Sequence, residues 1–338
     1  MFHRRLPISV LAAAATITAT ASIGLTAGAS QAAARPAATS AFTLHTMPDQ
    51  GITWFYSLVK GAKTSIDLTM YELQDTTAEA DLGAAAGRGV NVRVILDNRE
   101  KSQNQSAFNY LTAHKVSVAW SSSKYFFTHE KCMVVDGTTA AVMTLNLQSQ
   151  YYSTTRDFGV VDTNSADVAA IIKVFNADFT GASVTPGKGA DLVWSPTTAQ
   201  AKLLGIINGA STSLQIYAEE MDDTAVTNAM VSAAKRGVSV KVVGENESGE
   251  YDSEFSTLHK AGVQISYYSN PSGFYIHGKA IMADYNTSTS KIFIGSENFS
   301  NTSLTENREL GVIINNKAIE SSVNTSFNSD FKGGTIFS

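Results

Sequence analysis

The sequence predicts an α/β protein built from two similar halves. Three observations support this fold class: a long internal repeat, strand patterns that alternate with helix patterns, and a turn-rich junction between the copies. The repeat has an offset of 148 residues, which aligns His129 with His277. A period this long is far beyond one solenoid unit and indicates two domain-sized copies. We therefore expect two α/β sandwich halves related by pseudo-twofold symmetry.

Hydrophobic periodicity places the elements of each half in the same order. In the first half we expect helices at 50–60, 76–88, 104–114 and 165–179, and strands at 64–70, 90–96, 116–120, 129–135 and 140–145. In the second half we expect helices at 198–208, 223–236 and 317–331, and strands at 213–218, 238–243, 276–283 and 291–295. Asp136-Gly137 is a hairpin turn signal between two of these strands. Gly and Pro in segment 184–189 mark the junction, so the halves are expected at 41–186 and 187–338.

The first 34 residues predict a cleavable signal peptide. Arg4 and Arg5 precede an apolar stretch rich in Ala and Thr, and the small residues near Ala32 and Ala34 suit cleavage. An uncleaved membrane anchor is the alternative, but the stretch is only mildly apolar. We therefore expect residues 1–34 to be removed and the protein to be secreted.

Composition argues against a strongly basic nucleic-acid binder. The chain has 25 Lys and Arg against 30 Asp and Glu, a formal net charge of −5. Loss of Arg4 and Arg5 with the signal peptide would bring it to about −7, whereas nucleic-acid binders usually carry a basic surface. Cys132 is the single cysteine, so no intramolecular disulfide can form. By strand alternation it faces away from His129 and Lys131, which predicts a buried core thiol.

The pattern HxKxxxxD occurs twice at matching places in the repeat. The two copies comprise His129, Lys131 and Asp136, then His277, Lys279 and Asp284. Alternate residues on a strand share a face, so each His and its Lys can project into one cleft. An imidazole beside a fixed cation suits attack on an anionic phosphodiester. The two Asp residues have the opposite parity, and for them a turn or capping role is favoured over direct catalysis.

The doubled motif resembles the HKD motifs of the phospholipase D superfamily, and the resemblance runs from about residue 45 to 330. Members carry Gly-Ser-x-Asn after the motif; the second half has Gly295-Ser296-Glu297-Asn298. The first half has Met143-Thr144-Leu145-Asn146, which keeps the hydroxyl and the Asn but has Met in place of Gly. Asp157 and Glu309 follow, and each resembles the family carboxylate that hydrogen-bonds an active-site His and holds its tautomer.

The resemblance implies one active site at the interface of the two halves. His129 is expected to attack phosphorus and form a phosphohistidine, and His277 to protonate the leaving alcohol and then activate water. Lys131, Asn146, Lys279 and Asn298 are expected to bind the nonbridging phosphate oxygens. The candidate catalytic set is His129, Lys131, Asp136, Asn146, Asp157, His277, Lys279, Asp284, Asn298 and Glu309. No metal or other cofactor is expected, because no further ligand cluster is present in the sequence.

Glu72 and Glu220 are equivalent in the repeat, and each follows a predicted strand on the side where α/β proteins often bind ligands. They are either pocket residues or solvated loop acids. The aromatic residues ahead of each motif form either an apolar rim or part of the core: Tyr125, Phe126, Phe127, Phe274 and Tyr275. Tyr151 and Tyr152 follow Asn146 on a predicted loop and are better rim candidates.

Three function classes follow. The leading one is a secreted phospholipase D-type phosphodiesterase that yields phosphatidate and a head-group alcohol, with transfer of the phosphatidyl group to another alcohol as a related reaction. Its partners would be phospholipids and, transiently, a membrane surface; no obligate protein partner is evident. The alternative is a metal-independent endonuclease of the same superfamily, with nucleic acid as substrate. The third is a noncatalytic binding protein, against which the two intact motifs argue.

Overall fold

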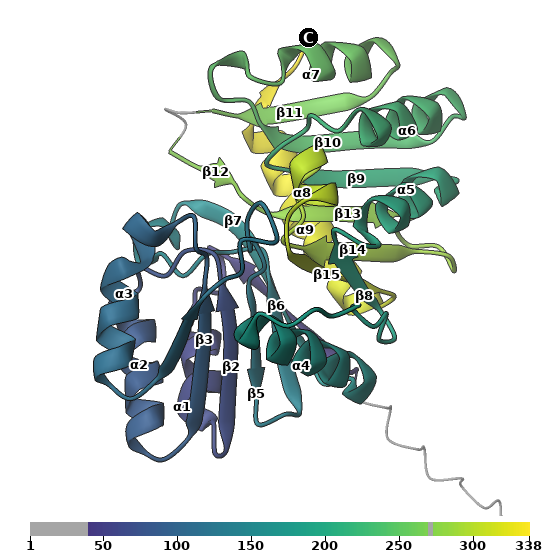
Figure 1. Cartoon of the computed structure of the whole chain (residues 1–338). Coiled ribbons are helices and arrows are strands. Elements are labelled where there is room, and N and C mark those ends of the chain that lie inside the picture. The colour runs from purple at the N-terminus through teal and green to yellow at the C-terminus, as the bar shows by residue number, and fades with distance from the viewer. Residues whose placement is uncertain (1–39, 270–272) are drawn as a thin grey trace, which may run out of the picture. The chain divides into compact units, whose positions relative to one another are not determined.

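The structure is a computed structural model that describes residues 40–269 and 273–338. These residues form two mixed, eight-stranded sheets with helices on both faces (Figure 1). The α/β fold with two repeated halves that the sequence predicts is therefore confirmed. The predicted signal peptide, residues 1–34, lies outside the described residues. No helix among the described residues is long and apolar enough to cross a membrane.

The first half contains seven strands and four α-helices within the described residues. Its strands are β1 (Phe42–Met47), β2 (Ser65–Met70), β3 (Asn91–Leu96), β4 (Ser117–Trp120), β5 (Cys132–Val135), β6 (Thr139–Met143) and β7 (Thr155–Asp162). Its helices are α1 (Thr53–Gly61), α2 (Thr76–Gly87), α3 (Lys101–Ala113) and α4 (Ser165–Thr180), with a 3-10 turn, η1, at Ser149–Tyr151. The strand order is β1-β7-β6-β5-β2-β3-β4. Helices α1 to α3 cover one face of this sheet and α4 covers the other (Figure 1).

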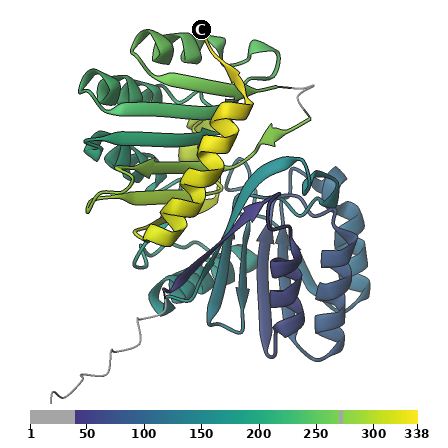
Figure 2. The same cartoon turned by 180° about the vertical axis from the view of Figure 1, so that it is seen from behind.

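The second half repeats this plan. Its strands are β8 (Leu192–Ser195), β9 (Ser213–Ala218), β10 (Ser239–Glu245), β11 (Gln264–Tyr268), β12 (Tyr275–Ile276), β13 (Lys279–Ala283), β14 (Lys291–Gly295), β15 (Glu309–Ile314) and β16 (Thr335–Ile336). Its helices are α5 (Ala199–Gly209), α6 (Thr224–Lys235), α7 (Asp252–Lys260), α8 (Asn301–Thr305) and α9 (Lys317–Gly333), with a 3-10 turn, η2, at Glu247–Gly249. The strand order is β16-β11-β10-β9-β13-β14-β15-β8. Helix α9 crosses the face opposite to α5, α6 and α7 (Figure 2).

The internal repeat is preserved in three dimensions. Strands β2 and β9, and likewise helices α2 and α6, begin and end at positions 148 residues apart. Both helices start with the same cap: the Asp75 carboxylate accepts the N–H groups of Thr77 and Ala78 at 2.9 and 3.2 Å, and Asp223 accepts from Val226 at 2.8 Å. An acceptor at this position satisfies N–H groups that lack a partner within the helix.

The predicted motif strands are shorter than expected. Strand β5 begins at Cys132 rather than at residue 129, because the preceding segment leaves its own sheet and meets the second half: Thr128 bridges to Arg308, whose carbonyl accepts the N–H of Glu130 at 2.9 Å. The segment before the second motif strand likewise meets the opposite half, since β12 pairs with β7 of the first sheet before β13 begins. Each motif histidine therefore lies where the chain crosses between the halves.

The sequence analysis missed the strands β1, β7, β8, β11, β15 and β16 and the helices α7 and α8. Strands β7 and β15 are sheet strands whose first residues are polar but buried, such as Arg156, Asp157 and Glu309. This breaks the apolar run that identifies a buried strand. These polar residues are held by partners from the other half, as described below.

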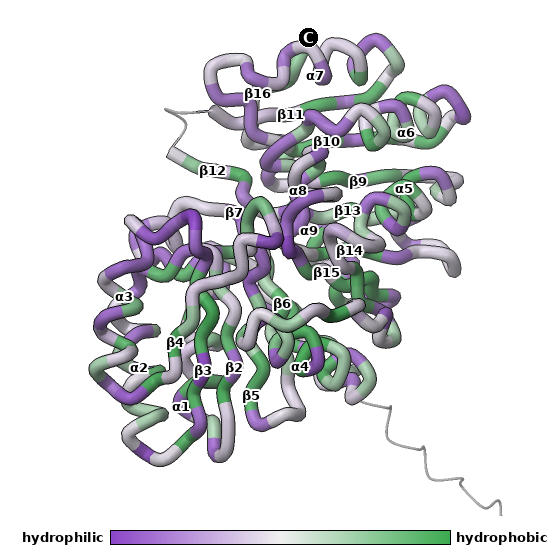
Figure 3. The backbone as a smooth tube through the Cα atoms, viewed as in Figure 1, coloured by the Kyte–Doolittle hydropathy of each residue, from purple (hydrophilic) through white to green (hydrophobic). Residues whose placement is uncertain are grey.

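Four clusters of buried apolar side chains stabilise the fold. One fills each half between its sheet and the helices α1 to α3 or α5 to α7, and hydrophobic residues follow the strands accordingly (Figure 3). The other two join the halves: Phe158 of β7 packs with Tyr217 and Phe327, and Cys132 packs with residues that include Trp194 and Leu310. The single cysteine is thus a buried core thiol, as predicted. Because apolar packing crosses the junction, the halves share part of their core.

Candidate active site

His129 is bound to a carboxylate from the opposite half of the chain. Its Nδ1 donates to Oε2 of Glu309 at 2.9 Å. Glu309 is fully buried at the start of β15, and its other oxygen accepts from Ser303 Oγ at 2.8 Å and from Asn307 Nδ2 at 3.0 Å. Burial lowers the pKa of His129 although Glu309 opposes that shift. Because an ionised carboxylate holds the Nδ1 proton, Nε2 is the ring nitrogen available for chemistry.

His277 is likewise bound to a carboxylate from the opposite half, in this case the first. Its Nδ1 donates to Oδ1 of Asp157 in β7 at 2.8 Å, and the Thr144 hydroxyl donates to the same oxygen at 2.5 Å. The next residue is Gly278, where a Cβ would lie 2.9 Å from the Phe158 ring. This close approach to β7 requires glycine at that position. The hydrogen bonds expected of Asp157 and Glu309 are present, and the partners are exchanged between the halves.

The two motif lysines lie beneath the histidines and are almost fully buried. Lys131 Nζ donates to the backbone oxygen of His129 at 2.6 Å and lies 4.9 Å from the centroid of the Tyr71 ring. Burial lowers the pKa of Lys131 to about 7. Lys279 forms an ion pair with Glu219 instead. The two lysines therefore have different partners, and neither is among the residues that line the cavity described below, where the sequence analysis expected both.

Asn146 and Asn298 follow the motif hairpins and face a shared cavity. Asn146 Nδ2 lies 3.5 Å from Glu72 Oε2. Asn298 is 3% exposed, and its backbone N–H is held by Ser303 Oγ at 2.8 Å. Among the described residues, neither amide oxygen has a hydrogen-bond partner. Each amide also carries an NH2 group with two N–H donors, which can donate to an anion in the cavity.

Asp136 and Asp284 lie at the other ends of β5 and β13, outside the cavity lining. The Asp136 carboxylate accepts the N–H groups of residues 63–65 at 2.7 to 3.0 Å, and Asp284 accepts those of residues 211–213 at 2.7 to 3.3 Å. Both have positive φ, 52° and 53°. The direct catalytic role considered for these two residues is thus not supported by their position, whereas the turn and capping role matches it.

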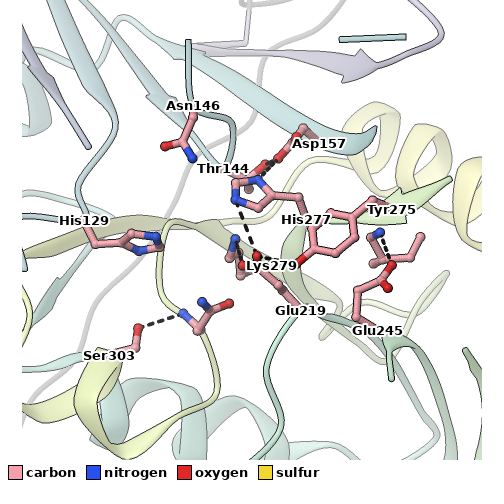
Figure 4. Close-up of polar contacts among 12 residues, drawn as sticks. His129, Thr144, Asn146, Asp157, Glu219, Glu245, Tyr275, His277, Lys279 and Ser303 are labelled. Carbon is pink, nitrogen blue, oxygen red and sulfur yellow. Dashed lines mark hydrogen bonds and ion pairs between the residues drawn. The ribbon is translucent and has the colours of Figure 1, made fainter. Parts of the chain in front are cut away.

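The cavity between the halves has a volume of about 860 Å³. Its wall combines both histidines, both asparagines, several carboxylates and aromatic rings. The lining residues used below are His129, His277, Asn146, Asn298, Glu72, Glu219, Glu220, Tyr71, Tyr151, Phe274 and Tyr275. Figure 4 shows His129 and His277 with Asn146, Lys279 and Glu219 around the same space. The sequence therefore identified both histidines and both asparagines that meet here, although these four residues come from four separate segments.

Carboxylates are more frequent in this wall than the motifs predict. Glu72 and Glu220, left open as pocket residues or loop acids, both line the cavity. Burial raises the pKa of both, that of Glu220 to about 6. Glu219 was missed. The internal repeat could have identified it. The 148-residue offset aligns Glu219 with Tyr71, and this is a position where two otherwise similar half-sites differ.

The aromatic residues divide between rim and core. Tyr151 and Tyr275 line the cavity with 52% and 42% of their surface exposed. Tyr152 is half-buried and donates to Asp75 at 2.8 Å. Tyr125 is buried beneath Arg308, whereas Phe126 is 40% exposed and lies under Arg99. No cluster of three or more His, Cys, Asp or Glu residues suited to a metal ion occurs within residues 40–269 and 273–338.

Comparison with known proteins agrees with this geometry. Residues 55–179 and 203–331 match the family described as "Cardiolipin synthase, PLD-like domain". Phospholipase D Y of Dictyostelium discoideum is 34% identical over 95 residues, which are 27% of this chain and 21% of that protein. The chain thus matches about a fifth of the length of that relative.

Two solved structures share the fold across most of the chain. Polyphosphate kinase from Porphyromonas gingivalis superposes with a TM-score of 0.67 at 13% identity, covering 86% of this chain and 50% of the kinase. Phosphatidylserine synthase from Haemophilus influenzae Rd KW20 superposes with a TM-score of 0.62 at 10% identity, covering 84% of each chain. At these identities the similarity concerns the fold.

Proposed function

Because this chain belongs to the phospholipase D-like family of phosphodiesterases, we propose that its substrates are phospholipids, which it cleaves to phosphatidate and a head-group alcohol. The observation that carries the proposal is the crossed pair of bonds, His129 to Glu309 and His277 to Asp157. Each leaves an Nε2 atom beside one cavity. Two imidazoles with fixed tautomers provide a nucleophile and a proton donor for one phosphodiester.

The proposed reaction has two displacements at phosphorus. His129 Nε2 forms a bond to phosphorus while the bond to the head-group oxygen breaks, and His277 Nε2 gives its proton to that oxygen. His277 then removes a proton from water, whose oxygen attacks phosphorus and breaks the N–P bond. Phosphatidate leaves and His129 is restored. An alcohol in place of water gives a transferred phosphatidyl group.

Charge in the transition state would be stabilised by the motif lysines and asparagines. We assign the nonbridging oxygens to Asn146 and Asn298, which line the cavity, and assign to the buried Lys131 and Lys279, which do not line it, stabilisation of the same negative charge from behind the cavity wall. The two ammonium groups are buried and the two amides face the cavity. Donors fixed in advance in a site of low polarity stabilise developing charge more than the same groups in water.

The cavity wall favours a lipid over a nucleic acid. Glu72, Glu219 and Glu220 all line it, and no Lys or Arg is among its lining residues in the described part of the chain. A nucleic acid brings a phosphate with every nucleotide, and flanking phosphates would be repelled by this wall. A phospholipid brings a single phosphodiester, and a cationic head group would be attracted. The exposed rings of Tyr151 and Tyr275 at the same cavity suit contact with a lipid surface.

The test uses protein lacking residues 1–34, phosphatidylcholine vesicles and a few per cent ethanol, with mass spectrometry as readout. We expect choline, phosphatidate and phosphatidylethanol from the wild type, and none from His129→Ala. Phosphatidylethanol reports a phosphatidyl group held on the protein long enough to be transferred. If a folded sample yields no lipid product but cuts single-stranded DNA or RNA in EDTA, the substrate is nucleic acid and the lipid proposal is wrong.

A further inference from the structure

The two half-sites differ at one equivalent position beside the motif histidines. Tyr71 directly follows β2, and Glu219 directly follows β9; the 148-residue offset relates them. The residue after each is the same, Glu72 in one half and Glu220 in the other. One half therefore presents an aromatic ring to the cavity where the other presents a carboxylate.

In the second half, Glu219 connects the motif residues. Its Oε2 pairs with Lys279 Nζ, and its Oε1 accepts the hydroxyl of Tyr275 at 2.8 Å. The same Oε1 lies 3.8 Å from His277 Nε2, the ring nitrogen that is not bound to Asp157 (Figure 4). Burial alone would raise the pKa of Glu219, but the positive charges of Lys279 and His277 hold it well below its ordinary value. A negative charge is thus present next to His277 Nε2.

In the first half, the same place holds no charge. The Tyr71 ring packs edge-on against His129, with centroids 4.6 Å apart, and its hydroxyl donates to Glu100 at 3.2 Å. Lys131 lies over this ring and forms no ion pair within the described residues. His129 therefore lies beside a lysine that forms no ion pair within the described residues, whereas the lysine beside His277 is paired with Glu219.

This difference assigns unequal tasks to two histidines that their motifs make equivalent. We propose that Glu219 is a positioning residue that makes His277 the histidine that holds and transfers the proton, and leaves His129 neutral as the nucleophile. A carboxylate near Nε2 stabilises imidazolium, which suits a proton donor to the leaving oxygen. An imidazole that attacks phosphorus must be unprotonated at Nε2, and burial, helped by the nearby Lys131, lowers the pKa of His129 although Glu309 opposes the shift. The inference rests on the proposed phosphodiesterase function.

The first experiment measures protonation without requiring turnover. Ring ¹⁵N shifts of His129 and His277 are followed from pH 5 to 9 in protein lacking residues 1–34, as wild type, Glu219→Gln and Glu219→Asp. In Glu219→Gln we expect the protonated fraction of His277 to fall to half at a pH lower by about one unit, roughly a tenfold change in proton affinity. His129 should move less, and Glu219→Asp, which keeps the charge, should resemble the wild type. An unchanged His277 titration in Glu219→Gln overturns the proposal.

The second experiment measures the rate with dihexanoyl phosphatidylcholine, a soluble diester that needs no vesicle and whose alcohol leaving group must be protonated. We expect the alkaline limb of kcat/KM in Glu219→Gln to move to lower pH by the same amount, with KM changed little. A structural role for Glu219 would instead lower the rate equally at every pH. Mass spectrometry of acid- and base-quenched protein should place the phosphoryl group on His129; a group on His277 would contradict the assignment.

The two experiments separate this inference from the proposed function. If the wild type cleaves neither this soluble diester nor phosphatidylcholine in vesicles, the proposed function fails, and the ¹⁵N titration still decides whether Glu219 controls the proton on His277. If cleavage occurs and the titration is unaffected by Glu219→Gln, the function stands and this inference fails.

Discussion

Glu309 and His129 lie 180 residues apart in the chain and 2.9 Å apart in the fold. The symmetric contact, Asp157 to His277, spans 120 residues. Each half of the protein thus supplies the carboxylate that orients the histidine of the other. Neither half contains a complete histidine–carboxylate pair, which makes the site a property of the whole chain.

Replacing either carboxylate should lower the rate greatly without unfolding the protein. Glu309→Gln keeps the shape and the contacts to Ser303 and Asn307, but the amide no longer fixes the Nδ1–H tautomer of His129. By analogy with other oriented histidines we expect kcat to fall on the order of 10³-fold. Glu306→Gln, which changes an exposed acid of the same segment, is the matched control. Near-normal turnover in Glu309→Gln would show that the crossed bond is not needed.

Replacing each histidine by alanine should stop the reaction at a different step. With a p-nitrophenyl diester the leaving group is a weak base and needs little protonation, so His277→Ala should still release one equivalent of nitrophenol and stop as an adduct. His129→Ala should release none. Stopped-flow absorbance and the intact mass of the protein measure the two outcomes. Equal bursts from both variants would refute the division of roles.

Asp136 should matter for stability and not for turnover. Its carboxylate holds three consecutive backbone N–H groups, which together lower its pKa to about 2 against the opposing effect of burial. Because the pKa of Asp136 is lower in the folded than in the unfolded state, its carboxylate stabilises the protein fully at pH values above the unfolded pKa of about 3.8. This contribution is lost as the pH falls toward 2.

Asp136→Asn tolerates the positive φ but removes the charge and one acceptor oxygen, so we expect a loss of about 1 to 2 kcal/mol in the free energy of unfolding at pH 7. The loss should shrink below pH 3. Urea denaturation at both pH values measures it, and kcat/KM should stay within twofold. A large loss of activity in a folded variant would restore a catalytic role for this residue.

The ion pair between Arg156 and Asp330 should be a major source of stability. It is bidentate, at 2.6 and 3.0 Å, and both residues are buried, at 4% and 5% exposure. It joins β7 of the first half to α9 of the second, and Tyr217 also donates to Asp330 at 2.7 Å. Asp330→Ala leaves the guanidinium without this partner, so we expect a loss of about 3 to 5 kcal/mol.

Lys60 and Asp81 provide the control for that measurement. Their pair has a similar distance, 3.2 Å, but the Lys60 side chain is 59% exposed. Lys60→Met should therefore change the free energy of unfolding by less than about 1 kcal/mol. Urea denaturation of both variants makes the comparison, and a similar small effect for Asp330→Ala would mean that the buried pair does not hold the halves together.

Local patterns predicted most of the regular structure. The boundaries of β2, β9, α2 and α6 were expected within about two residues, because apolar periodicity and an Asp cap define them locally. Strands β7 and β15 escaped prediction since Arg156, Asp157 and Glu309 are buried polar residues. Such residues are compatible with a strand only when partners elsewhere satisfy them, and those partners come from the other half.

The sequence by itself determined the repeat, the two HKD motifs and the identity of the histidines and asparagines that meet in the cavity. It did so because the repeat and the motif spacings are visible in one dimension. Only the tertiary structure decided that Asp157 binds His277 and that Glu309 binds His129. It also decided that Glu219 lies next to the Nε2 atom of His277, whereas its repeat equivalent Tyr71 packs against His129. Both depend on how the chain crosses between the sheets, where hydrogen bonds and ion pairs form over separations of 60 to 180 residues. No local pattern records such a crossing, because burial and charge pairing are set by residues that are distant in the chain.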